Sequence, residues 1–388
     1  MTASSTPMSG ALLYRGRCVV ETPHAGFTAH VAQNLATRQH AIALTLGDVT
    51  TPEPLLARVH SSCVTSESYG ACDCDCVTQL EAALAAIGAR GRGIVFYLMQ
   101  EGRGAGFAVK ARDRMMVQAS RHRLDTFEAY RRMGLRPDRR TYGEVPELAR
   151  LVGVGAPLVV LTSNPDKLAG LRSVMPIAGT EALGGDASPY NRHYLDAKIR
   201  LGHRLVAADE EAALAELPEV VDVFEPKPLP GRTRFVHLAA YLLPILDAGG
   251  PHWFRLSAYF DLESSVERVL LGYGSASAPA PLVRIQRERL LERFPLKGER
   301  RERSRFTASV EQIVARGSGL IALVPASGFD DGLAERPGDR TPSIELLAHH
   351  LAGRTAHPLA APDEAAEEIA AALAGAGIAV GTPVALPC

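Results

Sequence analysis

The chain lacks an excess of charge of either sign and any long apolar run. Its 42 Lys and Arg residues against 43 Asp and Glu residues give a formal net charge of −1. A near-neutral chain exerts no overall attraction on nucleic acid or on an anionic membrane, so any basic site must be local. No stretch approaches the roughly 18 consecutive apolar residues of a membrane span, which predicts a cytoplasmic protein without nucleic-acid or membrane partners.

The start of the chain lacks the features of a secretory signal. Residues 1–10 are rich in Ser, Thr and Pro, without a basic segment followed by an apolar one, and this pattern is typical of a frayed tail. We expect an irregular segment to about residue 25 and assign 1–34 to an N-terminal leader. The 388 residues allow two or three domains, each able to bury a core without disulfide bonds.

Cysteines are few and unevenly placed. A disulfide framework would spread them along the chain, whereas clustering in an intracellular protein indicates a metal site or catalysis. Four of the six lie within 14 residues. The six are Cys18, Cys63, Cys72, Cys74, Cys76 and Cys388.

The first half alternates between apolar strand patterns and amphipathic helix patterns. Such alternation predicts a layered α/β domain, which we place at 35–205. The expected strands are 40–46, 55–60, 93–98 and 158–161. The expected helices are 77–90, 108–121 and 126–133, and a further helix opens at 164–167.

The second half repeats part of this pattern after a break. Residues 206–230 are acidic and read as helical, then Pro-rich, so we assign 206–232 to a linker. Beyond it, strand patterns and an Arg-Gly-x-Gly turn recur in the order and spacing of the first half. We interpret 233–388 as a diverged repeat, against the alternative of chance similarity between two α/β segments. The expected elements are strands at 254–260, 269–271 and 282–285 and a helix at 363–373.

The clustered thiols form a candidate metal site. Cys63 follows a strand, and Cys74 and Cys76 precede a helix, so three thiolates can face one ion. Zinc is the usual ion for such ligands, and three protein ligands leave the open position of a catalytic site. Two alternatives stay open: Cys72 closes a structural four-cysteine site, or the thiols react without a metal. In the second half Arg289 stands where the first has Cys63, and nothing replaces Cys74 or Cys76.

Three further segments are candidates for binding phosphate. Residues 100–104 follow a buried strand, and Arg103 offers a two-pronged donor to an anion. Asp138 and Arg140 place a carboxylate beside a guanidinium, although a solvated turn is an alternative. Residues 162–167 open a helix whose N-terminus and Lys167 suit an anion, with ordinary capping by Ser163 or Asn164 as the alternative.

Taken together, these segments resemble the GTP cyclohydrolase II family over residues 35–205. The motifs are RVHSSC at 58–63, CDC at 74–76, QLEAAL at 79–84, QEGRG at 100–104, DT at 125–126, DRR at 138–140 and TSNPDK at 162–167. The resemblance implies a mixed-sheet α/β domain, catalytic Zn2+ on Cys63, Cys74 and Cys76, and Mg2+ on a nucleoside triphosphate. It leaves Cys72 outside the site. The resemblance also implies a homodimer.

The resemblance also assigns roles to individual residues. Asp138 corresponds to the proton acceptor, and Arg140 to an arginine nucleophile that takes the nucleotidyl phosphate as pyrophosphate leaves. The residues that it implies for nucleotide binding are Arg58, Val59, His60, Ser61, Ser62, Gln79, Glu101, Gly102, Arg103, Thr126, Thr162 and Lys167.

Three positions depart from the riboflavin-pathway enzyme of this family. Ser62 replaces a glutamate, Arg114 a tyrosine and Tyr130 an asparagine. These changes of charge and shape, beside matching metal and phosphate residues, favour the same hydrolytic machinery acting on another base. The chain looks closest to the branch of uracil catabolism, which predicts a UTP cyclohydrolase. The alternatives are a true GTP cyclohydrolase II, a hydrolase that opens a modified purine, and a nucleotide-binding regulator with structural zinc.

Overall fold

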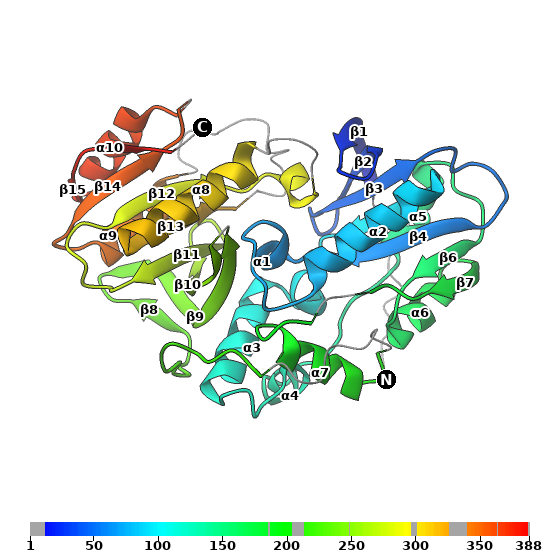
Figure 1. Ribbon diagram of the computed structural model, residues 1–388, viewed down its shortest axis with the longest axis horizontal. Helices are drawn as coiled ribbons and strands as arrows, with labels where there is room; N and C mark the ends of the chain where they lie inside the picture. The colour runs from blue at the N-terminus through cyan, green and yellow to red at the C-terminus, as the bar shows by residue number, and fades with distance from the viewer. Residues whose placement is uncertain are drawn as a thin grey trace.

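A computed structural model shows two α/β halves lying side by side (Figure 1). It describes residues 12–184, 187–203, 213–247, 249–295, 301–325, 340–362 and 364–386, with side chains in the sixteen-residue helix α8 given from residue 305 onward. Among the described helices, none has both the length and the apolar character needed to cross a membrane.

The first half is a seven-stranded mixed sheet with helices on both faces. Its strand order is β1-β2-β3-β5-β4-β6-β7. The strands are β1 Leu12–Glu21, β2 Gly26–Asn34, β3 His40–Leu46, β4 Leu55–Ser61, β5 Gly93–Leu98, β6 Leu158–Leu161 and β7 Ile177–Glu181. The helices are α1 Val64–Glu67, α2 Cys76–Arg90, the 3-10 turn η1 Glu101–Gly104, α3 Phe107–Ala119, α4 Thr126–Arg132, α5 Glu144–Leu151, α6 Pro165–Arg172 and α7 Arg192–Arg200.

The central strands are apolar along their whole length because both faces are covered. On one face, Leu80 and Ile87 of α2 pack against Tyr97 of β5. On the other, Val145 and Leu148 of α5 pack against neighbouring strands. Continuous burial of β3, β4 and β5 explains why the sequence shows unbroken apolar runs there. The strands and helices expected between residues 40 and 167 are confirmed.

The expectation of an irregular segment to residue 25 is wrong for residues 12–21, which form β1. β1 and β2 pair as an antiparallel hairpin at the edge of the first sheet. Most side chains of β1 are exposed, so the strand carries none of the alternating apolar signal that marks a half-buried strand. Residues 1–11 lie outside the described residues, and the boundary at 34 stays a prediction.

The second half is another mixed sheet, of order β8-β9-β10-β11-β13-β12-β14-β15, with β16 paired to β14. Its strands are β8 Lys227–Leu229, β9 Arg232–Asp247, β10 Gly250–Asp261, β11 Val266–Gly274, β12 Leu282–Arg287, β13 Ser318–Val324, β14 Thr355–Ala360, β15 Ala379–Val380 and β16 Val384–Ala385. Its helices are the 3-10 turn η2 Leu290–Arg293, α8 Arg301–Arg316, α9 Thr341–His350 and α10 Ala366–Gly375.

From β9 onward, the second sheet has the strand order and directions of the first. In each, three antiparallel strands are followed by four parallel ones, and a crossover helix, α2 in one and α8 in the other, joins the first two parallel strands of the chain. The match extends to single atoms. A Cβ on Gly93 would lie 2.8 Å from the Leu56 carbonyl oxygen, and one on Gly319 would lie 2.8 Å from that of Leu282.

The segment between the halves differs from the expected acidic helix. Residues 204–212 lie outside the described residues, and 213–226 form neither helix nor strand. Val221 nevertheless packs into an apolar cluster formed by side chains of both halves. The linker therefore belongs in part to the interface that it crosses.

Candidate active site

The three thiols predicted to bind metal come together. Cys63 lies two residues after the end of β4 and is the N-cap residue of α1, while Cys74 and Cys76 flank Asp75, the N-cap residue of α2. The three sulfur atoms lie within 4.8 Å of one another, and the sulfurs of Cys63 and Cys74 are 3.6 Å apart. Sulfur ligands of one tetrahedral zinc ion, each at about 2.3 Å, lie about 3.8 Å from one another. The cluster therefore fits a single zinc ion.

Cys72 is not part of this cluster. Its sulfur donates toward the carbonyl oxygen of Pro244 at 3.5 Å. Burial raises the pKa of Cys72 to about 12, which keeps it a neutral thiol. Within the described residues, the only cluster of His, Cys or carboxylate ligands consists of the three thiols. This arrangement does not support the four-cysteine site.

A buried lysine accompanies the thiols. Lys110 of α3 donates to the sulfur of Cys63 at 3.1 Å, to Thr65 Oγ1 at 2.8 Å and to Glu101 Oε1 at 2.9 Å. Hydrogen bonds from Cys74 and Cys76, together with the ammonium charge of Lys110, hold the pKa of Cys63 well below its usual range. Thiolate is the form that binds metal. Sequence reasoning did not assign Lys110 a role.

A chain of buried and partly buried hydrogen bonds links the loop that carries two of the thiols to the predicted nucleotide site. Lys198 of α7 forms an ion pair with Asp75 Oδ1. Gln79 Nε2 donates to Asp75 Oδ2 at 2.7 Å, and Arg58 Nη2 donates to Gln79 Oε1 at 2.6 Å. Each side chain in this series restrains the next. The series therefore fixes the position of the Arg58 guanidinium relative to the loop that bears Cys74 and Cys76.

A cavity of about 390 Å³ opens beside this network. Cys76 lines it, so the cavity reaches the thiol cluster. It also gathers most residues that the resemblance assigned to substrate. These are Arg58, His60, Ser61, Gln79, Arg103, Asp138, Arg140, Thr162 and Lys167.

The cavity is strongly cationic. Burial lowers the pKa of Arg58 to about 10. Burial, and the nearby charges of Arg58 and Arg140, lower the pKa of Lys167 well below its usual range. Cationic side chains that lie close together and away from water repel one another, and a bound anion offsets this repulsion. Asn164 caps α6 by accepting from the amides of Asp166 and Lys167, so the capping interpretation holds for that side chain.

Asp138 and Arg140 form a bidentate ion pair at the cavity wall. Arg140 Nε lies 3.0 Å from Asp138 Oδ1 and 3.1 Å from Oδ2, and Arg140 Nη2 also bonds Oδ2. Burial acts to raise the pKa of Asp138, but the hydrogen bonds and charge of Arg140 outweigh it and lower that pKa. Asp138 is therefore an ionised acceptor at neutral pH. The solvated-turn interpretation does not describe this pair, because both side chains are at least half-buried.

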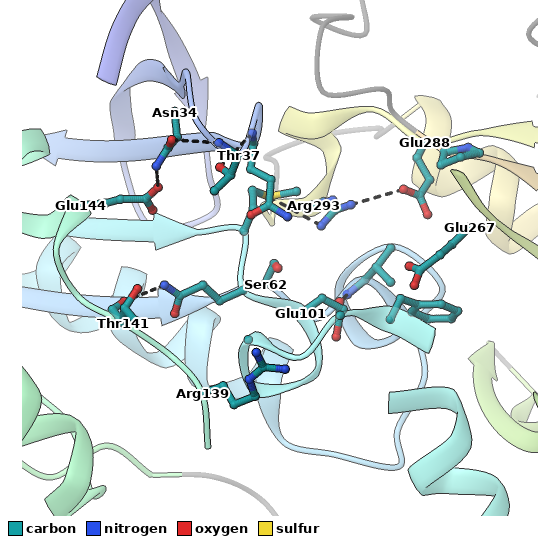
Figure 2. Close-up of a pocket in the computed structure, with 18 of the residues that line it drawn as sticks. Asn34, Thr37, Ser62, Glu101, Arg139, Thr141, Glu144, Glu267, Glu288 and Arg293 are labelled. Carbon is teal, nitrogen blue, oxygen red and sulfur yellow. Dashed lines mark hydrogen bonds and ion pairs between the residues drawn. The ribbon is translucent and has the colours of Figure 1, made fainter. Parts of the chain in front are cut away.

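Two predicted contacts face a different cavity. Ser62 and Glu101 line a hollow of about 810 Å³ between the halves. Figure 2 shows side chains of both halves around it, with Glu267, Glu288 and Arg293 coming from the second. The oxygen Oε2 of Glu101 accepts the amide of Val64 at 2.7 Å, next to a thiol. These two side chains therefore lie beside the metal cluster, across the wall from the cationic cavity.

The remaining predicted residues act from behind the cavity walls. Arg114 forms a buried ion pair with Asp73, with Nε 3.1 Å from Oδ2. Tyr130 donates to the carbonyl oxygen of Gly102 at 2.8 Å, and Thr126 donates to a buried aspartate. Val59 is a fully buried strand residue whose carbonyl oxygen accepts from Lys167. Ser62, Arg114 and Tyr130 thus do not converge on one pocket.

The structure adds an aromatic side chain that sequence reasoning missed. Tyr194 of α7 lines the cationic cavity. Its ring lies 4.8 Å from the guanidinium carbon of Arg114, 5.6 Å from that of Arg103 and 4.5 Å from Lys198 Nζ. Arg114 can therefore affect the cavity through Tyr194. The i, i+4 spacing of Tyr194 and Lys198 was the available sequence signal, because it places both on one helix face.

The ion pair of Lys198 leads to a stability prediction. We expect Lys198→Met to lower the free energy of unfolding by about 3–5 kcal/mol, because it leaves the buried Asp75 carboxylate without its cation. The control is Arg200→Ala, since Arg200 pairs with Asp125 on the exposed side and should contribute at most about 1 kcal/mol. Urea unfolding followed by circular dichroism measures both. Equal losses in the two variants would contradict the importance of the buried pair.

Comparison with known proteins gives a consistent result. The sequence model of the family described as GTP cyclohydrolase II matches residues 14–175. "GTP cyclohydrolase-2" of Azotobacter vinelandii is 40% identical over 186 residues, which cover 47% of this chain and 88% of that protein. "Riboflavin biosynthesis protein RibBA" of Bacillus cereus is 40% identical over 176 residues, covering 45% of this chain and 43% of that protein. Through its first half, the chain belongs to the GTP cyclohydrolase II family, whose members are hydrolytic nucleotide cyclohydrolases.

Proposed function

We propose that the protein is a zinc-dependent cyclohydrolase that opens the base of a uridine nucleotide, with UTP as substrate and pyrophosphate as a product, in uracil catabolism. The observation that carries the hydrolytic part is one cavity that joins the thiol cluster to six Arg and Lys side chains. The choice of uridine rests on the substitutions at Ser62, Arg114 and Tyr130. The cytoplasmic location, the homodimer and the lack of nucleic-acid or membrane partners belong to the same proposal.

The residues divide the work by chemistry. Arg58, Arg103 and Lys167 bind and orient the phosphates, which bring Mg2+ with them. Cys63, Cys74 and Cys76 would hold the zinc ion, which when bound lowers the pKa of water toward about 7 and supplies hydroxide at neutral pH. Tyr194 gives the cavity a flat face for the base. Hydrolysis then adds water across a ring C–N bond.

Asp138 and Arg140 carry the phosphate step. Arg140 attacks the α-phosphate, so that an N–P bond forms and the P–O bond to pyrophosphate breaks; water later cleaves the N–P bond, which releases the nucleoside monophosphate product and restores Arg140. The guanidinium must lose a proton as it attacks. Its hydrogen bonds to Asp138 place a carboxylate that can accept this proton beside the guanidinium nitrogens. Arg58 and Lys167 offset the charge that gathers on the leaving pyrophosphate.

Separate incubation with UTP and GTP tests the substrate. We expect purified protein to remove the ultraviolet absorbance of uracil and to release pyrophosphate with UTP, but to leave GTP intact. Turnover of GTP alone, with formate as product, would contradict the uridine assignment and leave a GTP cyclohydrolase II. That second candidate is favoured by the relatives of about 40% identity that carry this name.

The same assay separates an enzyme from a regulator. A regulator with structural zinc would bind a nucleoside triphosphate tightly and turn over none. We expect turnover instead, because the Asp138–Arg140 pair serves a reaction and is not needed for binding alone. Assaying modified purine nucleotides in parallel covers the remaining alternative.

We further propose that the second half is a diverged repeat without a metal site. Arg284 occupies the place of Arg58: its Nη1 donates to the carbonyl oxygen of Leu359 at 3.3 Å, as that of Arg58 does to Leu161 at 2.8 Å. Arg284, however, is neutralised within its own domain by an ion pair with Glu364. The matching topology of the sheets supports common ancestry over chance.

A further inference from the structure

The loop that carries the metal thiols touches the second half. Residues 64–75, here called the thiol loop, run from Cys63 to Cys76. We propose that strand β9 positions the metal-binding thiols, because it holds the thiol loop in the geometry that a zinc ion needs. The proposal rests on the proposed zinc-dependent function and gives the second half a role in it.

The contact begins in the backbone. Ala71 forms an isolated antiparallel bridge with Ile245 of β9. The amide of Leu246 donates to the carbonyl oxygen of Gly70 at 3.1 Å, and the amide of Cys72 donates to that of Pro244 at 3.0 Å. The thiol loop is thus paired to β9 through a single bridge with two flanking hydrogen bonds, just before the CDC thiols.

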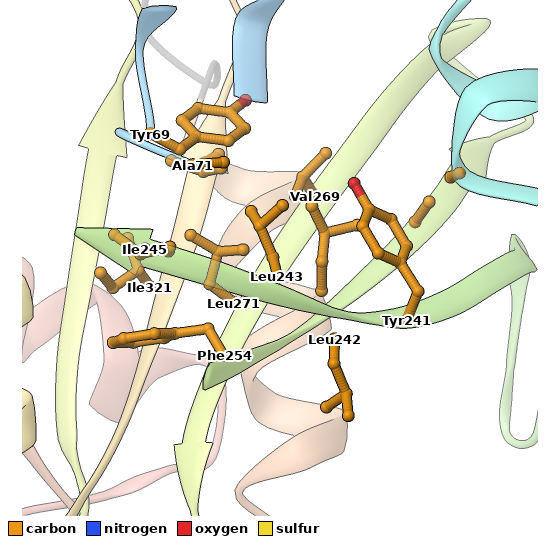
Figure 3. Packing of buried hydrophobic residues seen from close by; sticks show 14 of the residues in the cluster. Tyr69, Ala71, Tyr241, Leu242, Leu243, Ile245, Phe254, Val269, Leu271 and Ile321 are labelled. Atoms are coloured by element: carbon orange, nitrogen blue, oxygen red, sulfur yellow. The ribbon is translucent and has the colours of Figure 1, made fainter. Parts of the chain in front are cut away.

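Side chains bury this bridge. Tyr69 and Ala71 are each 2% exposed and belong to the same apolar cluster as Leu243 and Ile245 of β9. Figure 3 shows the side chains of Tyr69 and Ala71 over those of Ile245 and Leu243. Tyr69 also donates to Glu288, which follows β12. The bridge residues Ala71 and Ile245 are therefore fixed by apolar packing as well as by backbone hydrogen bonds.

The second half also holds the helix that bears Lys110. Gln118 of α3 donates to the carbonyl oxygen of Leu242 at 2.7 Å and accepts its amide at 2.8 Å. At the other end of α3, Glu267 Oε1 accepts the amide of Ala108 at 2.9 Å. Both elements around the Cys63 thiolate, the thiol loop and α3, are thus fixed from β9 and β11.

Substitution of Leu246 tests the backbone contact. Leu246→Pro removes the amide that bonds Gly70. That amide points away from β10, so the β9–β10 pairing keeps its own hydrogen bonds. Leu246→Ala is the matched control, because it keeps the amide and removes only a side chain that is 54% exposed.

Three readouts are compared for the purified full-length protein. Release of zinc to a chelator is expected to be on the order of tenfold faster in Leu246→Pro, and unchanged in Leu246→Ala. After replacement of zinc by Co2+, the visible absorption bands should shift in Leu246→Pro alone, since they report ligand geometry. Turnover should be lower in Leu246→Pro, the variant whose Co2+ spectrum is expected to shift, than in the wild-type protein. Wild-type release rates and spectra in Leu246→Pro would overturn the proposal.

A second pair covers the case in which Leu246→Pro does not fold. Cys72→Pro removes the other bridging amide, while Cys72→Ala keeps it and removes only the thiol. Faster zinc release from Cys72→Pro but not from Cys72→Ala supports the role of β9, and equal release contradicts it. Wild-type protein that holds zinc and turns over substrate, beside unaffected variants, overturns this proposal alone. Wild-type protein without zinc or turnover overturns the proposed function with it.

Discussion

The Cys74→Ser protein is expected to be isolated without zinc and to have no measurable turnover. Cys74 is one of three thiols whose sulfurs lie within 4.8 Å of one another, and its sulfur is 3.6 Å from that of Cys63. A serine hydroxyl stays protonated at neutral pH and is a poor ligand for zinc, so two thiolates would remain. Metal content by mass spectrometry and turnover of UTP and GTP measure the two effects.

Its control is another cysteine. Cys18 is exposed on β1 and takes no part in the thiol cluster, so Cys18→Ser should keep both metal and activity. Circular dichroism shows whether the Cys74→Ser protein keeps its fold. Full turnover by metal-free Cys74→Ser protein would refute the catalytic role of zinc.

Replacing Arg140 by alanine is expected to leave nucleotide binding and to stop the release of pyrophosphate. The proposed phosphate ligands Arg58, Arg103 and Lys167 remain in this variant, whereas the nitrogen that we propose as the nucleophile is gone. We expect the rate of pyrophosphate release to fall by at least about 100-fold. A coupled pyrophosphate assay measures the rate, and calorimetric titration with the triphosphate measures binding.

The matched control is Arg139→Ala. Arg139 is the neighbouring residue, but it lines the larger cavity between the halves. The Arg139→Ala substitution should therefore leave pyrophosphate release unchanged, although it removes the same positive charge as Arg140→Ala. Undiminished release from the Arg140→Ala protein would remove Arg140 as the nucleophile, and loss of binding would assign it to substrate affinity.

The sequence predicted elements whose residues are buried on both faces. Strands β3 to β6 and helix α2 carry apolar runs or helical spacing strong enough to be recognised without a structure. β1 could not be recognised in this way, because an exposed edge strand is stabilised by its pairing with β2 and not by apolar side chains. The order of the second sheet was also out of reach, since strand pairing depends on contacts distant in sequence.

The candidate site divides along the same line. Short motifs predicted the three thiols and the pair Asp138 and Arg140, because their members are close in sequence. Lys198 reaches Asp75 only after α7 packs beside α2, and no local pattern reports that approach. Ser62 and Glu101 were predicted to contact the nucleotide, and only the structure shows that they line a cavity other than the one that gathers the phosphate-binding candidates.

The bridge between Ala71 and Ile245 has a consequence for biosynthesis. A ribosome completes the thiol loop long before it makes β9, so the nascent chain exposes three thiols that nothing yet braces. Contacts between residues so far apart in sequence also form late in folding, because the loop between them must close first. Metal uptake in its final geometry should therefore follow translation of the second half, and chains truncated before β9 should be prone to oxidise at these cysteines.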